Sequence, residues 1–494
     1  MSPSFRLVLC ASPLLLSACH APVAAVATVE PEEISSLSPS LSAAAGPRTR
    51  EIAAPVYLDE LLREGLADAR ALEHLTELCR VAPHRLAGSA GAERAVEWGR
   101  QAMLAAGLEN VRLEPVMVPH WERGDIEELV VVEPAAHAGE RLAVLALGGS
   151  VGTSAEGLEA DVIAVQTFEE LTARAAEAHG KLVLFARPMD PAKLDPFEAY
   201  GGAVRQRSRG AEEAERVGAV GALVRSMKLK NDDHPHTGAM QYEDELERVP
   251  AAALSIVATE RVNAWLAAGE RVRLRLRLAC EWYEDVLSHN VVGEVVGRER
   301  PDEVVLVGGH LDAWDVGEGA HDDGAGCVHA LEACRLILRS SLGRPRRTVR
   351  CVFFMNEENG LRGGQAYRDT HLGELGKHVL AIESDRGGGL PAGYTAEAGV
   401  EGDALLAELW GGPAAGRGGG ADISPLAQDG VPLAGFYPSP QRYFDYHHSA
   451  NDVLEAVHPR ELQLGAISVA SMAWLAAEYE GEWPRVAGKG SAGH

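Results

Sequence analysis

One glycine-rich loop constrains this chain more than any other part of its sequence. The apolar run Val304–Val307 is typical of a buried strand and leads into Gly308–Gly326, which reads GGHLDAWDVGEGAHDDGAG. Glycine lets the backbone turn freely and approach other groups closely. Imidazole and carboxylate side chains together form a ligand set that hydrolytic zinc sites use. The loop offers such a set, so it predicts one half of a metal site; the candidates are His310, Asp312, Asp315, Asp322 and Asp323.

Three further strand-like runs downstream also end in polar side chains. They are Val349–Met355 before Asn356–Gly360, His378–Glu383 before Ser384–Gly387, and Val431–Tyr437, followed a short loop later by Tyr446–Ser449. Helix-like segments at Val328–Leu338 and Asp403–Leu409 alternate with these strands, which predicts an α/β sheet with helices on its faces. Ligands of such sheets bind at the carboxyl ends of strands. The sequence therefore predicts that the polar side chains converge.

The order His, Asp, Glu-Glu, Asp, His along these segments resembles the co-catalytic zinc aminopeptidase/carboxypeptidase family, and within it the carboxypeptidase Q-like members. The loop at Gly308–Gly326, the NEENG and IESDRG segments and Tyr446–Leu454 carry the resemblance. It implies a zinc-peptidase (phosphorylase/hydrolase-like) mixed α/β sheet flanked by helices, with an inserted protease-associated β-rich domain. It also implies a metallopeptidase that hydrolyses dipeptides or short peptides, as an aminopeptidase, a dipeptidase or a carboxypeptidase.

The resemblance assigns metal ligands to this chain. It implies two zinc ions per subunit, with Asp322 bridging them. His310 and Asp385 would complete one ion site, and Glu358 and His448 the other. Each ion then keeps room for a shared water or hydroxide, which the two cations would activate as the nucleophile.

Four other residues receive roles from the same resemblance. Glu357 is expected to be the general base that passes the proton of the water to the leaving amine. Asp312 is expected to orient the imidazole of His310 from behind. The peptide bond between Asp322 and Asp323 is expected to be cis, as in relatives. His447 stands where several relatives carry a tyrosine, so it is a candidate for contact with the oxyanion or the substrate.

The N-terminal segment predicts export and lipid attachment. Arg6 precedes the apolar run Leu7–Leu16, which is too short to span a bilayer and fits a secretory signal. The following Leu16-Ser17-Ala18-Cys19 matches the bacterial lipoprotein box, in which the cysteine is diacylated. We therefore expect membrane attachment through Cys19 in the bacterial cell envelope, at the outer membrane or facing the periplasm. The alternative is an ordinary signal peptide cut near Ala18.

The remaining organisation follows from local composition and from the resemblance. The expected parts are a signal peptide at 1–18, an Ala/Pro/Ser tether at 19–55, the first part of the peptidase domain at 56–116, the insert at 117–283, the second part with the metal site at 284–482, and a disordered tail at 483–494. The first part is expected to be helical. The insert is expected to be a lid, a subunit contact of a homodimer, or a decoration without a role; its Pro235–Gly238 segment has no assigned function.

Composition excludes several classes of protein. The formal net charge of −26 over 494 residues argues against nucleic-acid binding, because nucleic-acid binders carry basic patches. Seven cysteines occur, and loss of Cys10 with the signal and lipidation of Cys19 would leave an odd number, which is not a disulfide framework. Cys327 and Cys334 fall on one expected helix and are interpreted as small core residues.

Three other functions compete with the peptidase. Gly148–Gly152 matches the G-x-S-x-G pattern of serine hydrolases, but no helix pattern follows the serine, so a turn is expected there. The transferrin receptor keeps this fold as a catalytically silent scaffold, so the fold alone proves no activity. Glutaminyl cyclases share the ancestry and bind one zinc ion. The presence of all five ligand types and Glu357 favours the peptidase.

Overall fold

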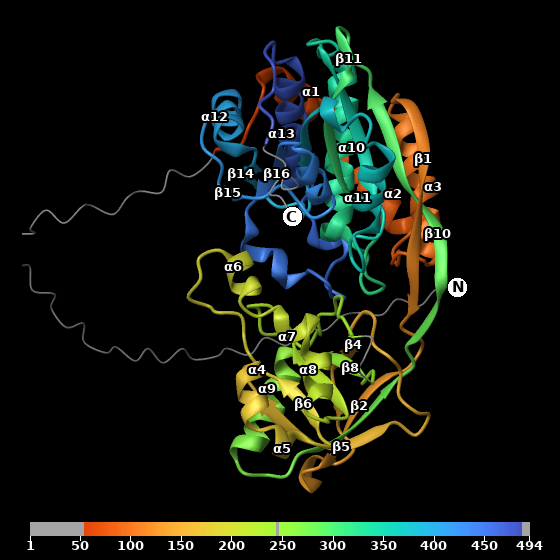
Figure 1. Ribbon diagram of the computed structural model, residues 1–494, viewed down its shortest axis with the longest axis vertical. Helices are drawn as coiled ribbons and strands as arrows, with labels where there is room; N and C mark the ends of the chain where they lie inside the picture. Colours follow the sequence, from red (N-terminus) through yellow and green to blue (C-terminus); the bar gives the residue numbers. More distant parts are fainter. Residues whose placement is uncertain (1–53, 244–246, 487–494) are drawn as a thin grey trace, which may run out of the picture. The chain divides into compact units, whose positions relative to one another are not determined.

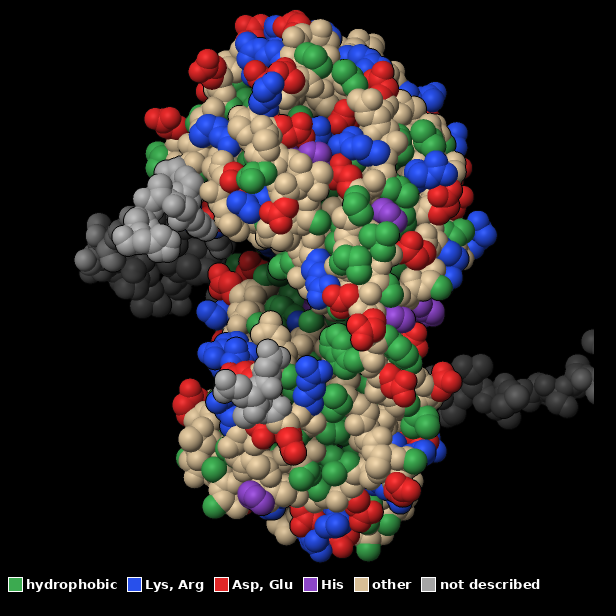
Figure 2. Space-filling view, turned by 45° about the vertical axis from the view of Figure 1, so that its right-hand side comes forward, with side chains coloured by type: hydrophobic (Ala, Val, Ile, Leu, Met, Phe, Trp, Pro, Cys, Tyr) green, Lys and Arg blue, Asp and Glu red, His purple; other side chains and the backbone are tan. Residues whose placement is uncertain are grey.

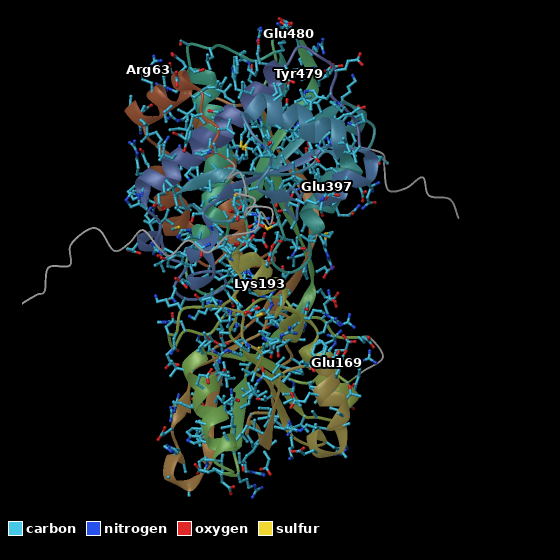
Figure 3. All side chains as sticks on the ribbon, turned by 90° about the vertical axis from the view of Figure 1, so that its left-hand side faces the viewer. Arg63, Glu169, Lys193, Glu397, Tyr479 and Glu480 are labelled. Carbon is cyan, nitrogen blue, oxygen red and sulfur yellow. The ribbon has the colours of Figure 1, made fainter. Side chains whose placement is uncertain are left out.

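The computed structural model describes residues 54–243 and 247–486. The predicted signal peptide, Cys19, and most of the tether and tail lie outside these ranges, so those expectations stay predictions. In the described part, no helix combines the length and apolar character needed to cross a membrane. On the face seen in Figure 2, acidic and basic side chains are interspersed. Arg63 and Glu480, labelled in Figure 3, are examples of exposed charged side chains.

The first of two mixed sheets has eight strands in the order β1-β10-β12-β11-β13-β16-β14-β15 (Figure 1). Its strands are β1 (Glu109–Glu122), β10 (Glu281–Val295), β11 (Arg300–His310), β12 (Arg347–Phe354), β13 (His378–Glu383), β14 (Pro391–Glu397), β15 (Gly416–Arg417) and β16 (Leu433–Pro438). The four central strands β12, β11, β13 and β16 run parallel. Their carboxyl ends therefore meet at one edge of the sheet.

Seven α-helices of the described ranges come from the segments of the chain that form the first sheet. They are α1 (Asp59–Ala67), α2 (Ala71–Val81), α3 (Ala90–Ala105), α10 (Ala325–Arg339), α11 (Arg362–Thr370), α12 (Gly399–Trp410) and α13 (Pro459–Glu478). Every residue of β12 is buried, as expected of a parallel strand that is covered on both faces. Pro459 begins α13, where its fixed φ suits the first helical turn and its missing N–H costs nothing.

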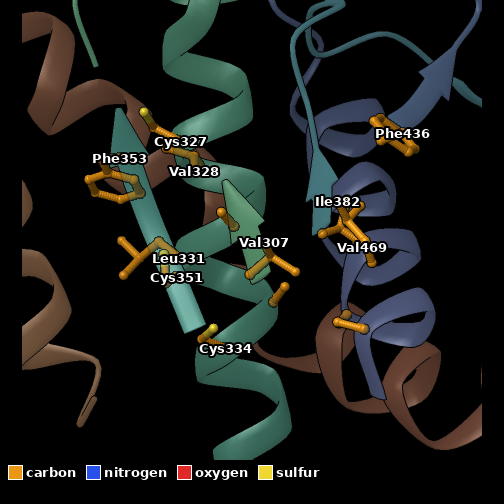
Figure 4. Close-up of a cluster of buried hydrophobic side chains, with 14 of the residues drawn as sticks. Val307, Cys327, Val328, Leu331, Cys334, Cys351, Phe353, Ile382, Phe436 and Val469 are labelled. Carbon is orange, nitrogen blue, oxygen red and sulfur yellow. The ribbon is translucent and has the colours of Figure 1, made fainter. Parts of the chain in front are cut away.

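The core between α10, α13 and the central strands is apolar and contains three thiols (Figure 4). Cys327 and Cys334 lie on α10 and face Cys351 and Phe353 of β12 across a cluster that includes Leu331. All five cysteines of the described ranges are free and buried. The prediction that Cys327 and Cys334 are small core residues is therefore confirmed.

The elements predicted around the metal loop are confirmed, whereas one prediction upstream is wrong. Residues 109–116 were expected to be helical, but they begin the long strand β1, which pairs antiparallel with β10. From Glu114 to Val118 the side chains alternate between buried and exposed, a period of two that is typical of a strand. The partner strand is more than 160 residues away in sequence, so local helix propensity does not reveal this pairing.

The second sheet comes from the segment predicted to be the insert. Its order is β3-β2-β9-β5-β6-β7-β8-β4. The strands are β2 (Glu127–Glu133), β3 (Arg141–Leu142), β4 (Val144–Ala146), β5 (Leu158–Val165), β6 (Leu182–Phe185), β7 (Gly221–Arg225), β8 (Ala251–Leu254) and β9 (Arg273–Leu278). The helices are α4 (Phe168–Ala173), α5 (Ala175–Ala178), α6 (Pro196–Gly201), α7 (Arg205–Ser208), α8 (Gly210–Arg216) and α9 (Ile256–Ala267). The boundaries expected at 117 and 283 fall within β1 and β10.

The G-x-S-x-G segment lies beside this sheet and forms a turn. The backbone N–H of Ser150 donates to the carbonyl of Leu147, and no helix follows the serine. The Ser150 hydroxyl donates a hydrogen bond to the carbonyl of Val151 and accepts one from the N–H of Ala251. A nucleophile elbow needs a helix directly after the serine and a free hydroxyl, so this segment is structural.

Replacement of Leu331 by alanine tests the core. Leu331 is fully buried, and Leu331→Ala should lower the free energy of unfolding by about 2–5 kcal/mol through lost burial and the remaining cavity. Leu194→Ala is the control, because Leu194 is 82% exposed and should change little. Chemical denaturation measures both variants, and equal effects would contradict this assignment of the core.

Candidate metal centre

The parallel strands bring the predicted ligands to one edge of the first sheet. His310 ends β11, Asp385 is the second residue after β13, and Glu358 lies in the turn after β12. Asp322 comes from the glycine-rich loop before α10, and His448 from the loop after β16. Five side chains that are spread over more than 130 residues of sequence thus meet in one place.

The carboxylate of Asp322 stands between two histidines. His310 Nε2 lies 3.3 Å from Asp322 Oδ1 and 3.5 Å from Asp385 Oδ1. His448 Nε2 lies 3.3 Å from Asp322 Oδ2 and 3.0 Å from Glu358 Oε2. The two oxygens of Asp322 therefore face two separate groups of donors, each with one imidazole and one further carboxylate.

Buried donor atoms without partners show that this site fits metal ions. His310 Nε2, Asp322 Oδ2 and Glu358 Oε1 are buried and have no hydrogen-bond partner in the described ranges. Unsatisfied buried polar atoms are costly unless something pairs with them. Close groupings of possible ligand atoms include His310, Asp322 and Glu358 in one set and Asp322 with His447 and His448 in another. The imidazole and carboxylate donors suit a divalent cation such as zinc.

The electrostatics of the site also call for cations. Burial raises the pKa of Glu357 and Glu358 well above the usual range, and His310 lowers both pKa values in part. The negative charge of Asp385 raises the pKa of Glu357 further, and that of Asp322 raises the pKa of Glu358. The pKa of Asp322 is nevertheless lowered, because the nearby imidazoles of His310, His448 and His447 favour its ionised form more strongly than burial opposes it. Carboxylates that are crowded in this way need positive charge to remain ionised together.

Asp312 organises the turn after β12. Its Oδ1 accepts the backbone N–H groups of Asn356 at 2.8 Å and Glu357 at 3.1 Å, and its Oδ2 accepts that of Glu358 at 3.3 Å. The Nδ1 of His310 lies 3.0 Å from the backbone carbonyl of Asp312 and 3.8 Å from its carboxylate. The main chain of Asp312 thus orients the imidazole, and its side chain positions the Glu357–Glu358 pair.

Asp452 and Asp323 hold the backbone around Asp322. The peptide bond between Asp322 and Asp323 is cis, as expected. The Asp452 carboxylate accepts the N–H groups of His321 and Asp322 at 2.7 and 3.0 Å. The Asp323 carboxylate accepts the N–H groups of His310 and Gly326. A side chain at Gly326 would overlap the Asp323 carboxylate, so glycine is required there.

Arginines that the sequence did not single out secure the same loop. Arg85 is fully buried and donates to the carbonyl oxygens of Leu311, Glu318 and Gly319 at 2.6–2.7 Å. Asp315, for which the sequence suggested no role, pairs with Arg123 at 2.6 Å. The sequence carries no local signal for these contacts, because the burial of each arginine and the identity of its acceptors depend on segments that are distant in sequence.

The two adjacent histidines lie differently. His448 has a left-handed backbone (φ 56°), and its Nε2 is closer to Asp322 than the Nε2 of His447, which is 3.8 Å away. The two rings stack with centroids 3.5 Å apart. Burial lowers the pKa of both, that of His448 to about 3. His448 Nε2 is thus the nearer of the two to Asp322, while both histidines belong to the same group of possible ligand atoms.

The Pro235–Gly238 segment joins the insert to His448. The N–H of Thr237 donates to the His448 carbonyl at 2.9 Å, and the Thr237 carbonyl lies 3.3 Å from His448 Nδ1. A metal ligand histidine is commonly oriented by such a carbonyl on its second nitrogen. The insert thus contributes directly to the position of a predicted ligand.

A cavity of about 450 Å³ opens onto these residues. Glu357, Asp385 and His448 line it from the first sheet, and Tyr200 and Arg207 line it from the insert. This volume is within the range of small-molecule sites. The arrangement can therefore hold metal ions beside a pocket that is large enough for a small substrate.

Comparison with known proteins agrees with this geometry. The model of peptidase family M28 matches residues 290–472, which include every predicted metal ligand. Carboxypeptidase Q of Bos taurus and of Homo sapiens are each 36% identical over 428 residues, which cover 85% of this chain and 88% of theirs. The chain belongs to peptidase family M28. It is a carboxypeptidase Q-like metallopeptidase of that family.

Solved structures place this M28 peptidase in the same fold. The M28 peptidase precursor from Shewanella amazonensis SB2B is 35% identical with a TM-score of 0.82, and the match covers 86% of this chain and 97% of that one. A zinc aminopeptidase from Bacillus subtilis is 20% identical with a TM-score of 0.60 over 84% of this chain and 97% of that one, which shows the fold alone. The mixed α/β peptidase fold expected from the sequence is confirmed.

Removal of the Asp452 carboxylate tests how the M28 peptidase holds the backbone of Asp322. Asp452→Ala leaves the N–H groups of His321 and Asp322 without their acceptor, so metal affinity should fall about 10–100-fold. Asp452→Asn keeps one acceptor oxygen and should fall between this variant and the wild type. Titration with a competing chelator measures the affinity. Unchanged affinity in Asp452→Ala would show that the loop holds its shape without this carboxylate.

Proposed function

We propose that this chain is a zinc-dependent exopeptidase that hydrolyses the peptide bond of dipeptides or short peptides. The observation that carries the proposal is the Asp322 carboxylate, whose two oxygens face His310 and His448 separately. His310 and Asp385 would hold one zinc ion and Glu358 and His448 the other, with Asp322 shared between them. Bound zinc would polarise the attacking water and the scissile carbonyl.

Glu357 is the general base in this proposal. Its side chain is 21% exposed and lines the cavity, whereas that of the neighbouring Glu358 is 2% exposed. Its Oε2 lies 4.0 Å from His310 Nε2, so the carboxylate stands next to the donor cluster without joining it. Glu357 takes a proton from the attacking water and delivers it to the nitrogen of the leaving amine. Asp312 keeps this carboxylate in place through the N–H of Glu357.

His447 is the proposed contact for the oxyanion that develops on the scissile carbonyl. It lines the same cavity, and its Nδ1 is buried without a hydrogen-bond partner in the described ranges. Tyr443, Phe444 and Tyr200 surround its ring and fix its orientation. An N–H that is held rigidly in this way can stabilise charge that develops in the transition state.

The Glu357→Gln variant tests the general base. Glutamine keeps the shape but cannot accept the proton, so kcat on a cleaved dipeptide should fall by about 2–4 orders of magnitude. The zinc content, measured by mass spectrometry of the metals, should stay at the wild-type value, because Glu357 is not a ligand. Loss of zinc together with rate would instead make Glu357 a ligand and would contradict the assignment.

Metal content tests the shared carboxylate. Chelation should abolish hydrolysis and zinc should restore it, with two ions per chain in the active protein. Asp385→Ala and Glu358→Ala should each weaken binding of one ion, whereas Asp322→Ala should weaken both. A protein that binds no zinc and regains no activity with metal would be a silent scaffold. Cyclisation of N-terminal glutamine in place of dipeptide hydrolysis would make it a glutaminyl cyclase.

A further inference from the structure

Arg207 is a buried cation at the metal site without an acidic partner. It lies on the short helix α7, is 8% exposed, and lines the cavity that contains Glu357 and Asp385. No carboxylate of the described ranges lies within ion-pair distance of its guanidinium, and its Nε has no hydrogen-bond partner there. A buried charge without a counter-ion is costly, so this guanidinium is arranged for an anion that comes from outside the chain.

The two neighbouring arginines of the same segment, Arg205 and Arg209, have the surroundings that are common for a surface arginine. Arg205 is exposed and lies over the ring of Phe168, with 5.7 Å from its Cζ to the ring centroid. Arg209 pairs with Glu212 at 2.6 Å. The α6–α7 segment begins shortly after Lys193, which is labelled in Figure 3. Arg205 also has no ion pair within the described ranges, but it is exposed to solvent; Arg207 alone of the three arginines is buried and lines the cavity.

The surrounding chain holds the guanidinium in place. Its Cζ lies 5.7 Å from the centroid of the Tyr200 ring, and one of its terminal nitrogens lies 3.5 Å from the Thr237 carbonyl. Gly238 packs directly on the guanidinium (φ 133°), and any side chain there would overlap it. The Pro235–Gly238 segment, which the sequence left without a role, therefore contacts both Arg207 and His448.

The contact with His448 leaves the arginine free to bind. One terminal nitrogen of Arg207 lies 3.3 Å from His448 Nδ1. If His448 uses Nε2 as a metal donor, its proton is on Nδ1 and points to the Thr237 carbonyl, 3.3 Å away. Nδ1 then cannot accept a hydrogen bond from Arg207. The N–H donors of Arg207 that do not face the Thr237 carbonyl are left for a ligand, and a carboxylate can pair with a guanidinium in a bidentate manner.

We propose that Arg207 binds the α-carboxylate of the C-terminal residue of the substrate, on the leaving-group side of the scissile bond. This inference rests on the proposed peptidase function. One imidazole ring, that of His448, separates the guanidinium from the metal donors. The α-carboxylate carbon of a C-terminal residue is three bonds from the scissile carbonyl carbon, within about 4 Å. A carboxylate on Arg207 thus belongs to the residue directly after the cleaved bond, and one residue is released from the C-terminus.

Arg386 is the other arginine close to the ligands, and it is less suited to this role. Its Cζ lies 4.5 Å from the ring centroid of Phe197 and 5.5 Å from that of Tyr437. The planar guanidinium of Arg386 is therefore already in contact with two aromatic rings. Arg207 in turn is fixed by the backbone at Gly238 and by Tyr200, which suits a residue that recognises one group in one orientation.

Matched acids and amides test the proposal on the intact zinc-loaded protein. The substrates are alanyl-, leucyl- and seryl-leucine and the corresponding leucinamides, which share the same scissile bond. The wild type should cleave the acids with kcat/KM about 100-fold higher than the amides, the size expected when a buried charge loses its partner. Equal rates on acids and amides would overturn the role of Arg207 and leave the proposed peptidase intact. No cleavage of any of these peptides would overturn both.

Variants separate this role from a structural one. Arg207→Gln should lose about 100-fold in kcat/KM on the acids and little on the amides, with zinc content unchanged. Arg207→Lys should recover part of the loss, and Arg205→Gln, two residues away and exposed, should behave like the wild type. An equal loss on acids and amides would overturn the proposal, since it would indicate an oxyanion or a folding role.

Binding of the product gives a readout that does not depend on turnover. Free leucine should raise the melting temperature of the wild type more than leucinamide does, and Arg207→Gln should abolish that difference. A difference that persists in Arg207→Gln would place the carboxylate elsewhere in the cavity and overturn the assignment.

Discussion

The position of one carboxylate, that of Asp322, governs the rest of this site. Its two oxygens must face two groups of donors at once, each with one histidine and one further carboxylate. The backbone around it is therefore held from several directions: Asp452 accepts its N–H, and Asp323 accepts that of His310. Arg85 binds three carbonyl oxygens of the preceding loop. Buried hydrogen bonds of this kind fix a geometry that carboxylates in mutual repulsion would not adopt by themselves.

The parallel strands explain why such a cluster can form at all. β11, β12, β13 and β16 run in the same direction, and the residues that follow them reach one edge of the sheet. The insert then acts on the site through Thr237, which holds His448, and through Arg207, which faces the cavity. The pocket is thus lined by both parts of the chain, and its residues Tyr200 and Arg207 lie outside the segment that the M28 family model matches.

Much of this could be predicted from the sequence because the signals were local. Apolar runs that end in His310, in the Glu357–Glu358 pair and before Asp385 predicted both the strands and the ligands. The helix expected over residues 109–116 was wrong, because β1 is defined by its pairing with β10, more than 160 residues away. The Asp312 carboxylate was expected to orient the imidazole of His310. Instead its two oxygens accept the backbone N–H groups of the turn after β12. Such hydrogen bonds depend on loop geometry that residue types do not encode.

The sequence by itself determined the kinds of ligand, their order and the strand ends that carry them, because these follow from short-range patterns of apolar and polar residues. It also determined that one loop must be rich in glycine, as Gly326 shows by its contact with Asp323. Only the tertiary structure decided which atoms face one another. Arg207 illustrates the difference: in the sequence it is one of three similar arginines, and only the folded chain buries it without a counter-ion, because burial and pairing depend on residues brought together from distant segments.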